Sequence, residues 1–260
     1  NQMNTTINLA TIVACCMISF AQAQIENPTP QAEEMPEKMN IVKTNVTAYA
    51  FRNFNFTYER AINQWFSLNI GFGTMPEGKV PFMSSFLNEE DEKQFQNLEI
   101  KATNFTLEPR FYIGHGYGKG FYFAPYYRYS SVETNSFDFY YNYQPVNGVT
   151  YQIPLTGKGD TRGHSGGLMV GTQFFLNRAQ NLVLDFWIAG AHYGTGKGDF
   201  ELKSDVYLNP EMQAQLKKEI EDLDVPFVEY TVETNTEGAR IKVDGPWAGL
   251  RSGLSLGYRF

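Results

Sequence analysis

Apolar and polar residues alternate one by one along eight segments of the chain, which has 260 residues. Successive residues of a β-strand point to opposite faces, so this period of two predicts strands with two unlike faces. In the last segment, Leu250, Leu254 and Phe260 share one face, while Arg251 and Arg259 occupy the other. The predicted strands cover residues 40–49, 53–61, 65–73, 100–113, 120–133, 165–176, 181–189 and 247–260.

The two faces of these strands differ in chemistry. One face is large, apolar and rich in aromatic residues, and water would tolerate eight such faces poorly. The other face carries the charged residues Lys43, Glu59, Glu108, Arg110, Arg128, Asp185 and Arg251. Both faces would be in a suitable environment if the apolar ones contacted lipid and the charged ones lined a lumen. We therefore expect an all-β fold, an eight-stranded antiparallel transmembrane β-barrel.

The charges expected in the lumen set its character. An eight-stranded barrel has an interior just wide enough for side chains to fill. An unpaired buried charge is expensive, so the four bases and three acids are expected to pair and close the lumen. The alternative is a gated pore or a proton-linked path. A soluble lipocalin-like barrel, with its apolar faces turned inward around a small ligand, is the alternative fold.

The links between the strands alternate in length after the first. Outer-membrane barrels have long external loops and short periplasmic turns, and an even number of strands leaves both ends in the periplasm. One side takes the links near 49–52, 74–99, 134–164 and 194–246, and the other takes those near 62–64, 114–119 and 177–180. The long links are therefore predicted to be external.

Two of the long links are predicted to contain short helices. Asn209 followed by Pro210 is typical of a helix cap with proline in the first turn. Met212 and Leu216 then share one face of a helix over 210–223, which could pack on the barrel rim or on a partner. Residues 84–99 are a weaker candidate for the same role.

Composition supports these expectations. The chain is 42% hydrophobic, 15% aromatic and 19% charged, with 23 glycines, which is unlike a helical bundle or a disordered chain. A net charge of -7 argues against a nucleic-acid binder. No apolar run reaches the roughly 18 residues of a membrane helix, but β-barrel strands cross a membrane at average hydropathy. The acidic residues gather in the predicted loops and in the linker before the first strand.

The N-terminal residues indicate export. Residues 1–23 are typical of a signal peptide, with cleavage after Ala23. Residues 24–39, rich in Pro and Glu, are predicted to be a disordered periplasmic linker, and residues 40–260 the barrel. Alternatives are a lipoprotein signal with Cys15 lipidated, or a retained anchor. The only cysteines are Cys15 and Cys16, so cleavage after Ala23 would leave none.

Candidate catalytic groups are few. His164 and Ser165 lie together near the predicted external strand ends, with His192 on a neighbouring strand and Glu133 or Asp199 as a possible acid. A third histidine, His115, sits in a glycine-rich turn. The spacing forms no recognised motif, so we expect no enzyme, no cofactor and no metal.

Two glycine runs also attract attention. Residues 157–160 and 194–199 resemble phosphate loops, but they lack the full spacing and a following helix. They are predicted to be paired loop turns, with weak metal binding by Asp160 and Asp199 as the alternative.

Two motifs carry a resemblance to known proteins. The end of the chain, with Leu254, Leu256, Tyr258 and Phe260 on one face, resembles the assembly signal of outer-membrane barrels. Residues 43–46 (Lys-Thr-Asn-Val), 58–60 (Tyr-Glu-Arg) and 65–68 (Trp-Phe-Ser-Leu) resemble a family of uncharacterised small Gram-negative outer-membrane β-barrel proteins. The family implies a location and a fold but no activity.

The expected function is that of a structural or interaction protein acting through its external loops. Its expected partners are outer-membrane lipids and lipopolysaccharide, the barrel-assembly machinery, and a possible protein at the loops. A small pore or transporter and a membrane-embedded lipid-modifying enzyme are the alternatives.

Overall fold

The computed structural model describes residues 38–79, 98–114, 116–145, 148–222 and 228–260. All described elements belong to the unit Glu37–Phe260. The predicted signal peptide, the linker up to residue 37, nearly all of the predicted helix 84–99, and His115 lie outside the described residues. The elements are β1 (Asn40–Asn45), η1 (Thr47–Phe51), β2 (Phe54–Ala61), β3 (Phe66–Lys79), β4 (Glu99–Tyr112), β5 (Gly120–Tyr143), β6 (Tyr151–Phe175), β7 (Leu182–Ser204), α3 (Pro210–Glu221), β8 (Glu229–Asn235) and β9 (Gly238–Arg259).

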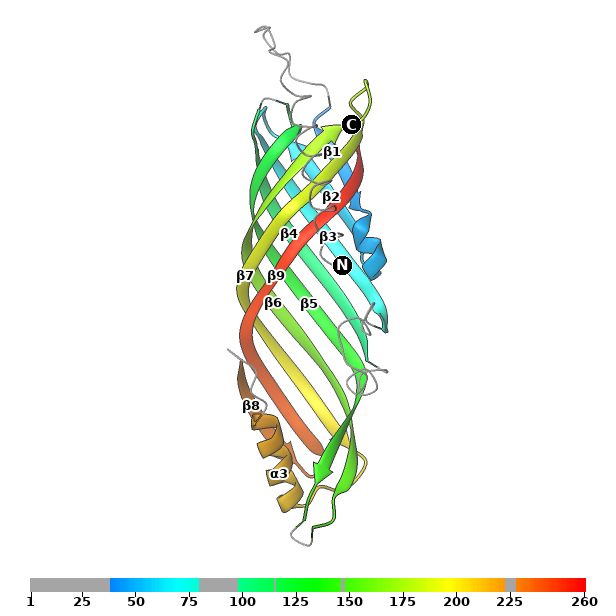
Figure 1. Ribbon diagram of the computed structural model, residues 1–260, viewed down its shortest axis with the longest axis vertical. Helices are drawn as coiled ribbons and strands as arrows, with labels where there is room; N and C mark the ends of the chain where they lie inside the picture. Colours follow the sequence, from blue (N-terminus) through cyan, green and yellow to red (C-terminus); the bar gives the residue numbers. More distant parts are fainter. Residues whose placement is uncertain (1–37, 80–97, 115, 146–147, 223–227) are drawn as a thin grey trace, which may run out of the picture. The chain divides into compact units, whose positions relative to one another are not determined.

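The strands form one antiparallel sheet that closes into a ring (Figure 1). Eight strands follow the order β1-β2-β3-β4-β5-β6-β7-β9, and β9 pairs back with β1 from Ile41↔Arg259 to Asn45↔Ser255. The prediction of eight antiparallel strands is therefore confirmed for the ring. The short strand β8 pairs only with β9 and lies outside the ring.

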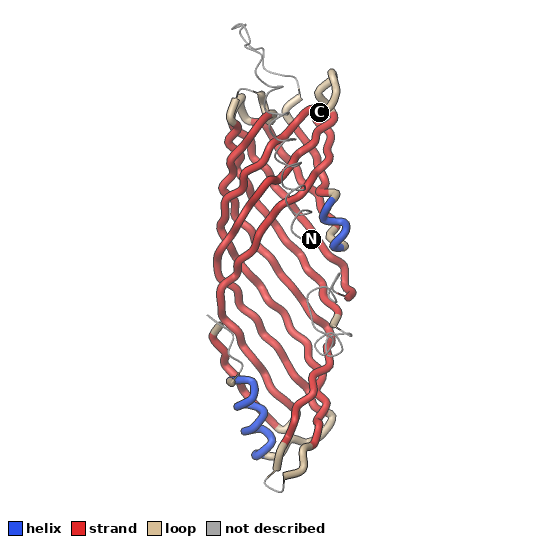
Figure 2. Tube along the Cα trace, in the orientation of Figure 1, coloured by secondary structure: helices blue, strands red, loops and turns tan. Residues whose placement is uncertain are grey.

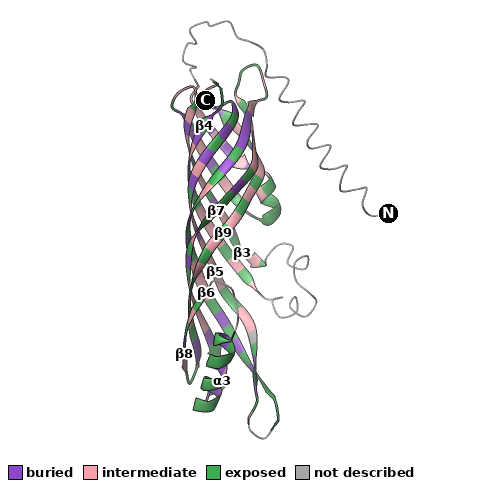
Figure 3. Ribbon diagram, turned by 60° about the vertical axis from the view of Figure 1, so that its left-hand side comes forward, coloured by how far each residue is buried: buried purple, intermediate pink, exposed green. Residues whose placement is uncertain are grey.

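Both ends of the described chain lie at one end of the ring. The Asn40 amide donates to the Phe260 carbonyl at 3.0 Å, and the Phe260 amide donates to the Asn40 carbonyl at 2.8 Å. Buried and exposed positions alternate along the strands of this closed part (Figure 3). On β9, Arg259 is buried, whereas the neighbouring Tyr258 and Phe260 are exposed. The apolar faces of the predicted strands are thus the outer face of the ring.

The first strand is shorter than predicted, because residues 46–49 do not continue it. The Asn45 side-chain oxygen accepts hydrogen bonds from the Thr47 hydroxyl and the Ala48 amide, at 2.7 and 3.0 Å. These bonds turn the chain into the 3-10 helix η1, which lies beside the wall of the ring (Figure 2). Arg52, in the left-handed region at φ 56°, ends η1.

The prediction that residues 134–164 and 194–246 form loops is wrong for most of these residues. Here β5, β6, β7 and β9 run on far beyond the ends of β1 and β2, together with β8, and we call this part of the sheet the extension. Its glycines leave room for aromatic rings on the inner face. A Cβ on Gly157 would meet the Phe137 ring at 2.2 Å, and one on Gly163 would meet the Trp247 ring at 2.3 Å. The glycine runs are therefore strand segments in register, not loop turns.

A β-bulge changes the alternation on β7. The register against β9 shifts between Trp187 and Gly190, so β7 carries one residue more than its partner there. As a result, Ala189, which was expected on the inner face, is exposed. Beyond the bulge, His192 lies on the inner side, where its ring contacts the buried side chain of Tyr126.

The predicted helix after Asn209 is confirmed as α3. The Asn209 side chain accepts a hydrogen bond from the Met212 amide at 2.9 Å, and Pro210 occupies the first turn. Met212, Leu216 and Ile220 are buried. They join a cluster with inner-face residues of the extension, namely Tyr141, Tyr143, Ile153, Leu155, Leu202 and Ala239. The helix therefore packs on the inner face of the extension. Within the described residues, no helix is long and apolar enough to cross a membrane.

Leu216→Ala should loosen the extension while leaving the ring intact. Leu216 is fully buried, and truncating such a side chain costs about 2–5 kcal/mol. We expect faster amide hydrogen exchange in α3 and β8 and unchanged exchange in β1 and β2. Lys217→Ala, which removes an exposed side chain from the same helix, is the control. Equal exchange in both variants would contradict the packing described here.

Candidate functional site

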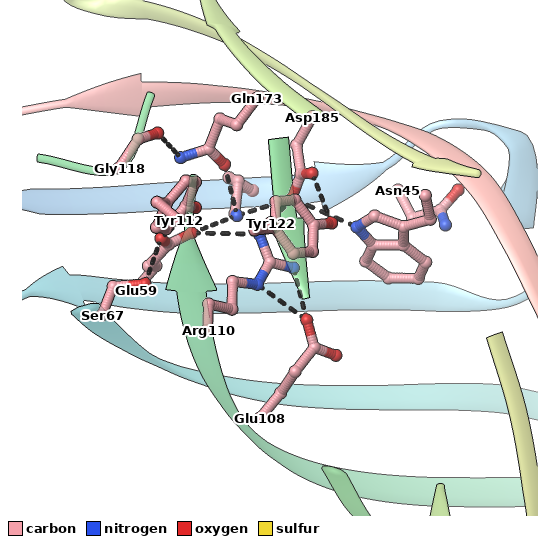
Figure 4. A network of polar contacts seen from close by, with 12 residues as sticks. Asn45, Glu59, Ser67, Glu108, Arg110, Tyr112, Gly118, Tyr122, Gln173 and Asp185 are labelled. Carbon is pink, nitrogen blue, oxygen red and sulfur yellow. Dashed lines mark hydrogen bonds and ion pairs between the residues drawn. The ribbon is translucent and has the colours of Figure 1, made fainter. Parts of the chain in front are cut away.

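A cluster of buried charges fills the closed part of the ring (Figure 4). Lys43 on β1 lies within 2.5 Å of Glu59 on β2 and within 2.7 Å of Asp185 on β7. All three side chains are fully shielded from solvent. Alternation places each of them on an inner face, and ring closure brings β1 and β7 to either side of β9.

Arg110 on β4 is the second cation of the cluster, and it is fully buried. Its Nη1 lies 2.7 Å from Asp185 and 3.2 Å from Glu59, and its Nη2 lies 2.6 Å from Glu108. Each carboxylate of the cluster thus contacts at least one guanidinium or ammonium group. Such pairing offsets the cost of removing the charges from water.

Neutral side chains add hydrogen bonds to the charged cluster. The hydroxyls of Ser67 and Tyr112 donate to Glu59 at 2.6 and 2.7 Å, and the Tyr122 hydroxyl donates to Asp185 at 2.9 Å. Gln173 accepts from Lys43 at 2.8 Å and donates to the Gly118 carbonyl at 2.7 Å. The sequence analysis did not assign these partners, although their inward positions in the alternation are a signal for them.

The two remaining predicted lumen cations, Arg251 and Arg128, differ in their ion pairing. Arg251 on β9 lies 3.3 Å from Glu108 and stacks over the rings of Tyr126 and Trp187. Arg128 on β5 donates to the Thr106 hydroxyl at 3.4 Å and has no ion pair among the described residues. The structure therefore joins six of the seven predicted charges in one network and leaves Arg128 beside it.

Arg259 is a further buried cation of the inner face. It stacks over Phe175 and donates to Gln180 at 3.1 Å, close to the paired ends of the chain. It makes no ion pair with the network within the described part of the chain.

A cavity of about 460 Å³ lies against the network. Most of its inner lining is carboxamide and hydroxyl groups, from Asn45, Asn53, Asn55, Thr57, Asn69, Asn104 and Thr106. Arg128, Arg251 and Trp187 also line it. We call this cavity the polar chamber.

The candidate catalytic residues are not brought together. His164 is exposed and its Nδ1 lies 2.6 Å from the Tyr127 hydroxyl. Ser165, the next residue of β6, is buried on the opposite face and donates to the Arg128 carbonyl at 3.4 Å. The ring of His192 contacts Tyr126, not His164 or Ser165. These positions do not form a nucleophile and base pair.

Asp160 and Asp199 are direct partners in the pairing of β6 with β7. However, Arg240 holds Asp199 through two hydrogen bonds of 2.9 and 2.6 Å, and these bonds lower the pKa of the Asp199 carboxyl. Asp160 lies 3.3 Å from Arg162. Among the described residues, no group of three or more His, Cys, Asp or Glu side chains could hold a metal ion.

The residues of the predicted assembly signal lie on the outer face of β9. Leu256, Tyr258 and Phe260 are exposed, and Leu254 is half-buried. Their strand closes the ring against β1.

Comparison of the chain with protein-family models, curated proteins and solved structures finds no match.

Asp185→Asn should destabilise the protein by about 3–5 kcal/mol, since it leaves Lys43 and Arg110 short of a buried counter-charge. The double variant Lys43→Met/Asp185→Asn should recover part of that loss, because it removes a cation together with the carboxylate. The urea midpoint of unfolding measures both effects. Asp160→Asn, at an exposed ion pair, should change stability by less than about 1 kcal/mol. A double variant no more stable than Asp185→Asn would contradict the coupling.

Proposed function

We propose that this protein is an outer-membrane β-barrel with a lumen closed by side chains, and that it acts as a structural or interaction protein through its external end. The observation that carries the proposal is the reversed distribution of its side chains. Large apolar residues cover the outside of the ring, while Lys43, Glu59, Arg110 and Asp185 are buried inside it. A lipid bilayer is the solvent that suits both faces.

The outer apolar residues form a band of limited height. On β4 it runs from Phe105 to Ile113, and on β5 from Phe121 to Tyr129. A strand needs about 9–11 residues to cross a bilayer. Beyond the band, the next outward charges are Lys101, Glu133, Arg162 and Lys197, on four neighbouring strands. These charges would lie at the polar surface of the membrane.

The exposed fractions support lipid contact over water contact. Phe56 is 54% exposed, Phe72 51% and Leu250 88%. A soluble lipocalin-like barrel would hold such residues inside around its ligand. In this ring the interior is charged, which argues against that alternative.

The two ends of the sheet suggest an orientation. The end that carries Asn40 and Phe260 would face the periplasm, and the extension with α3 and β8 would be external. Outward charges such as Lys158 and Glu201, 3.0 Å apart, cover the extension and suit an aqueous environment. Lipids and lipopolysaccharide are the proposed partners along the band, and a protein partner could bind the extension. The barrel-assembly machinery would recognise β9.

The protein should be an integral membrane protein in Gram-negative cells. We expect it in the outer-membrane fraction, resistant to carbonate or urea extraction, and with different gel migration in detergent before and after boiling. Recovery in the soluble fraction, or migration that boiling does not change, would refute the proposed location.

The lumen should not conduct ions. The network from Lys43 to Arg110 occupies the ring interior and supports a closed lumen over a pore. Folded protein in planar bilayers is therefore expected to give no stable conductance. Reproducible channels of defined size, lost on heat denaturation, would establish a pore instead.

A further inference from the structure

The polar chamber lies next to the network on the side of the extension. Its lining combines the carboxamides of Asn55, Asn69 and Asn104 with the guanidinium groups of Arg128 and Arg251. Neutral donors and cations around one cavity are the groups that recognise an anion.

The charge around the chamber is unbalanced. Glu108 is the carboxylate nearest to Arg251, at 3.3 Å, and the same carboxylate pairs with Arg110 at 2.6 Å. Arg128 lines the chamber and makes no direct ion pair among the described residues. A half-buried guanidinium in this position favours an anionic ligand, because a bound anion would offset the cost of the unpaired cation.

The chamber reaches the outer surface through the wall of the ring. The strand β1 ends at Asn45, whereas its partner β9 continues to Gly238. Beyond Asn45, toward the extension, the chamber is lined by Ala48 and Phe51 of η1 on one side and by Leu250 and Ser252 of β9 on the other. Leu250 and Ser252 occupy outward positions of β9. The opening is therefore lateral, and it is flanked by exposed apolar residues.

The level of this opening is that of the apolar band. Arg128 follows the outward residues Phe123 and Tyr127 on β5, and the first outward charge of that strand is Glu133. A molecule entering sideways would therefore come from the hydrocarbon region rather than from water, if the band is embedded as proposed above.

We propose that the polar chamber binds the carboxylate or phosphate head group of a single-chain amphiphile, whose apolar chain leaves between η1 and β9. This inference rests on the proposed membrane location. Arg128 would hold the anion, with Arg251 and the carboxamides of Asn69 and Asn104 as further donors. The exposed side chains of Phe51 and Leu250 would contact the chain.

Binding of dodecanoate to the folded protein in neutral maltoside micelles tests the proposal. Equilibrium dialysis with radiolabelled ligand, corrected for empty micelles, gives the affinity. We expect saturable binding, at least tenfold weaker for Arg128→Gln and partly restored for Arg128→Lys. Arg162→Gln, which removes an exposed arginine paired with Asp160 on the outer face, should bind as the unmodified protein does.

A second variant fills the chamber without changing its charge. A Cβ on Gly71 would lie 3.5 Å from the Thr57 hydroxyl, an ordinary contact, so the backbone there accepts a side chain. Gly71→Leu should weaken dodecanoate binding at least tenfold even if Arg128→Gln does not fold. Migration before and after boiling reports folding, so loss of the barrel is distinguished from loss of binding.

The ligand series separates the sources of the anion. Dodecyl phosphate should compete with dodecanoate, whereas acetate, inorganic phosphate and dodecanol should each compete at least tenfold less well. If acetate or inorganic phosphate competes as well as dodecanoate, the ligand does not need an apolar chain, and the proposal is overturned. If dodecanol competes equally, the site does not recognise an anion. If Arg128→Gln and Gly71→Leu both bind with the affinity of the unmodified protein, the polar chamber is not the binding site.

Discussion

The ion-pair network inside the ring is the constraint on which the rest of the structure depends. The register of β1 with β9 runs from Ile41 to Asn45, and backbone hydrogen bonds of Asn40 and Val46 extend it by one residue at each end, so a short ladder closes the ring. Lys43 on β1 reaches past β9 to Asp185 on β7, and also contacts Glu59 on β2. A shift of one residue in the register would turn a strand's inner side chains outward and leave their partners unpaired. The charges therefore favour one register for the closing strands.

The extension follows the same alternation with different contents. Where the ring holds charges, the extension holds Tyr141, Leu155 and Leu202, and α3 covers them with Leu216. Four long strands without a closing partner would leave this inner face open, and a 12-residue helix shields part of it from water. The outer face changes in the opposite sense, from apolar side chains on the ring to ion pairs such as Asp199 with Arg240 on the extension. Polarity thus inverts on both faces along the same strands.

The sequence predicts those features of the structure that depend on neighbouring residues, and misses those that depend on contacts between distant strands. Period-two alternation is local, so it predicted the faces of the ring strands and the inward positions of Lys43, Arg110 and Asp185. It failed where the residues have an ambiguous local meaning. Glycines such as Gly157 and Gly163 are typical of turns, but here they make room for rings that lie close only after folding. The bulge near Trp187 and the role of Gln173 in the network depend on cross-strand register, which no single segment encodes. Likewise, the sequence gives a near-balance of charge without indicating that Arg128 is the cation left over.

The charge-filled interior of the ring and the lateral opening of the polar chamber have one origin, the unequal length of the strands. Because β1 and β2 have only 6 and 8 residues while β9 has 22, the wall beside β9 is complete only where the network lies. At that level, toward the paired chain ends Asn40 and Phe260, backbone pairing closes the ring and ion pairs fill it. Farther toward the extension, η1 replaces the missing strand, and a 3-10 helix cannot form a ladder with the edge of β9. An interior cation at this height therefore faces a cavity that reaches the outer surface instead of a neighbouring strand. If the ring spans a membrane, that arrangement favours exchange with the lipid phase over passage along the axis, since the axial route leads through fully buried Arg110.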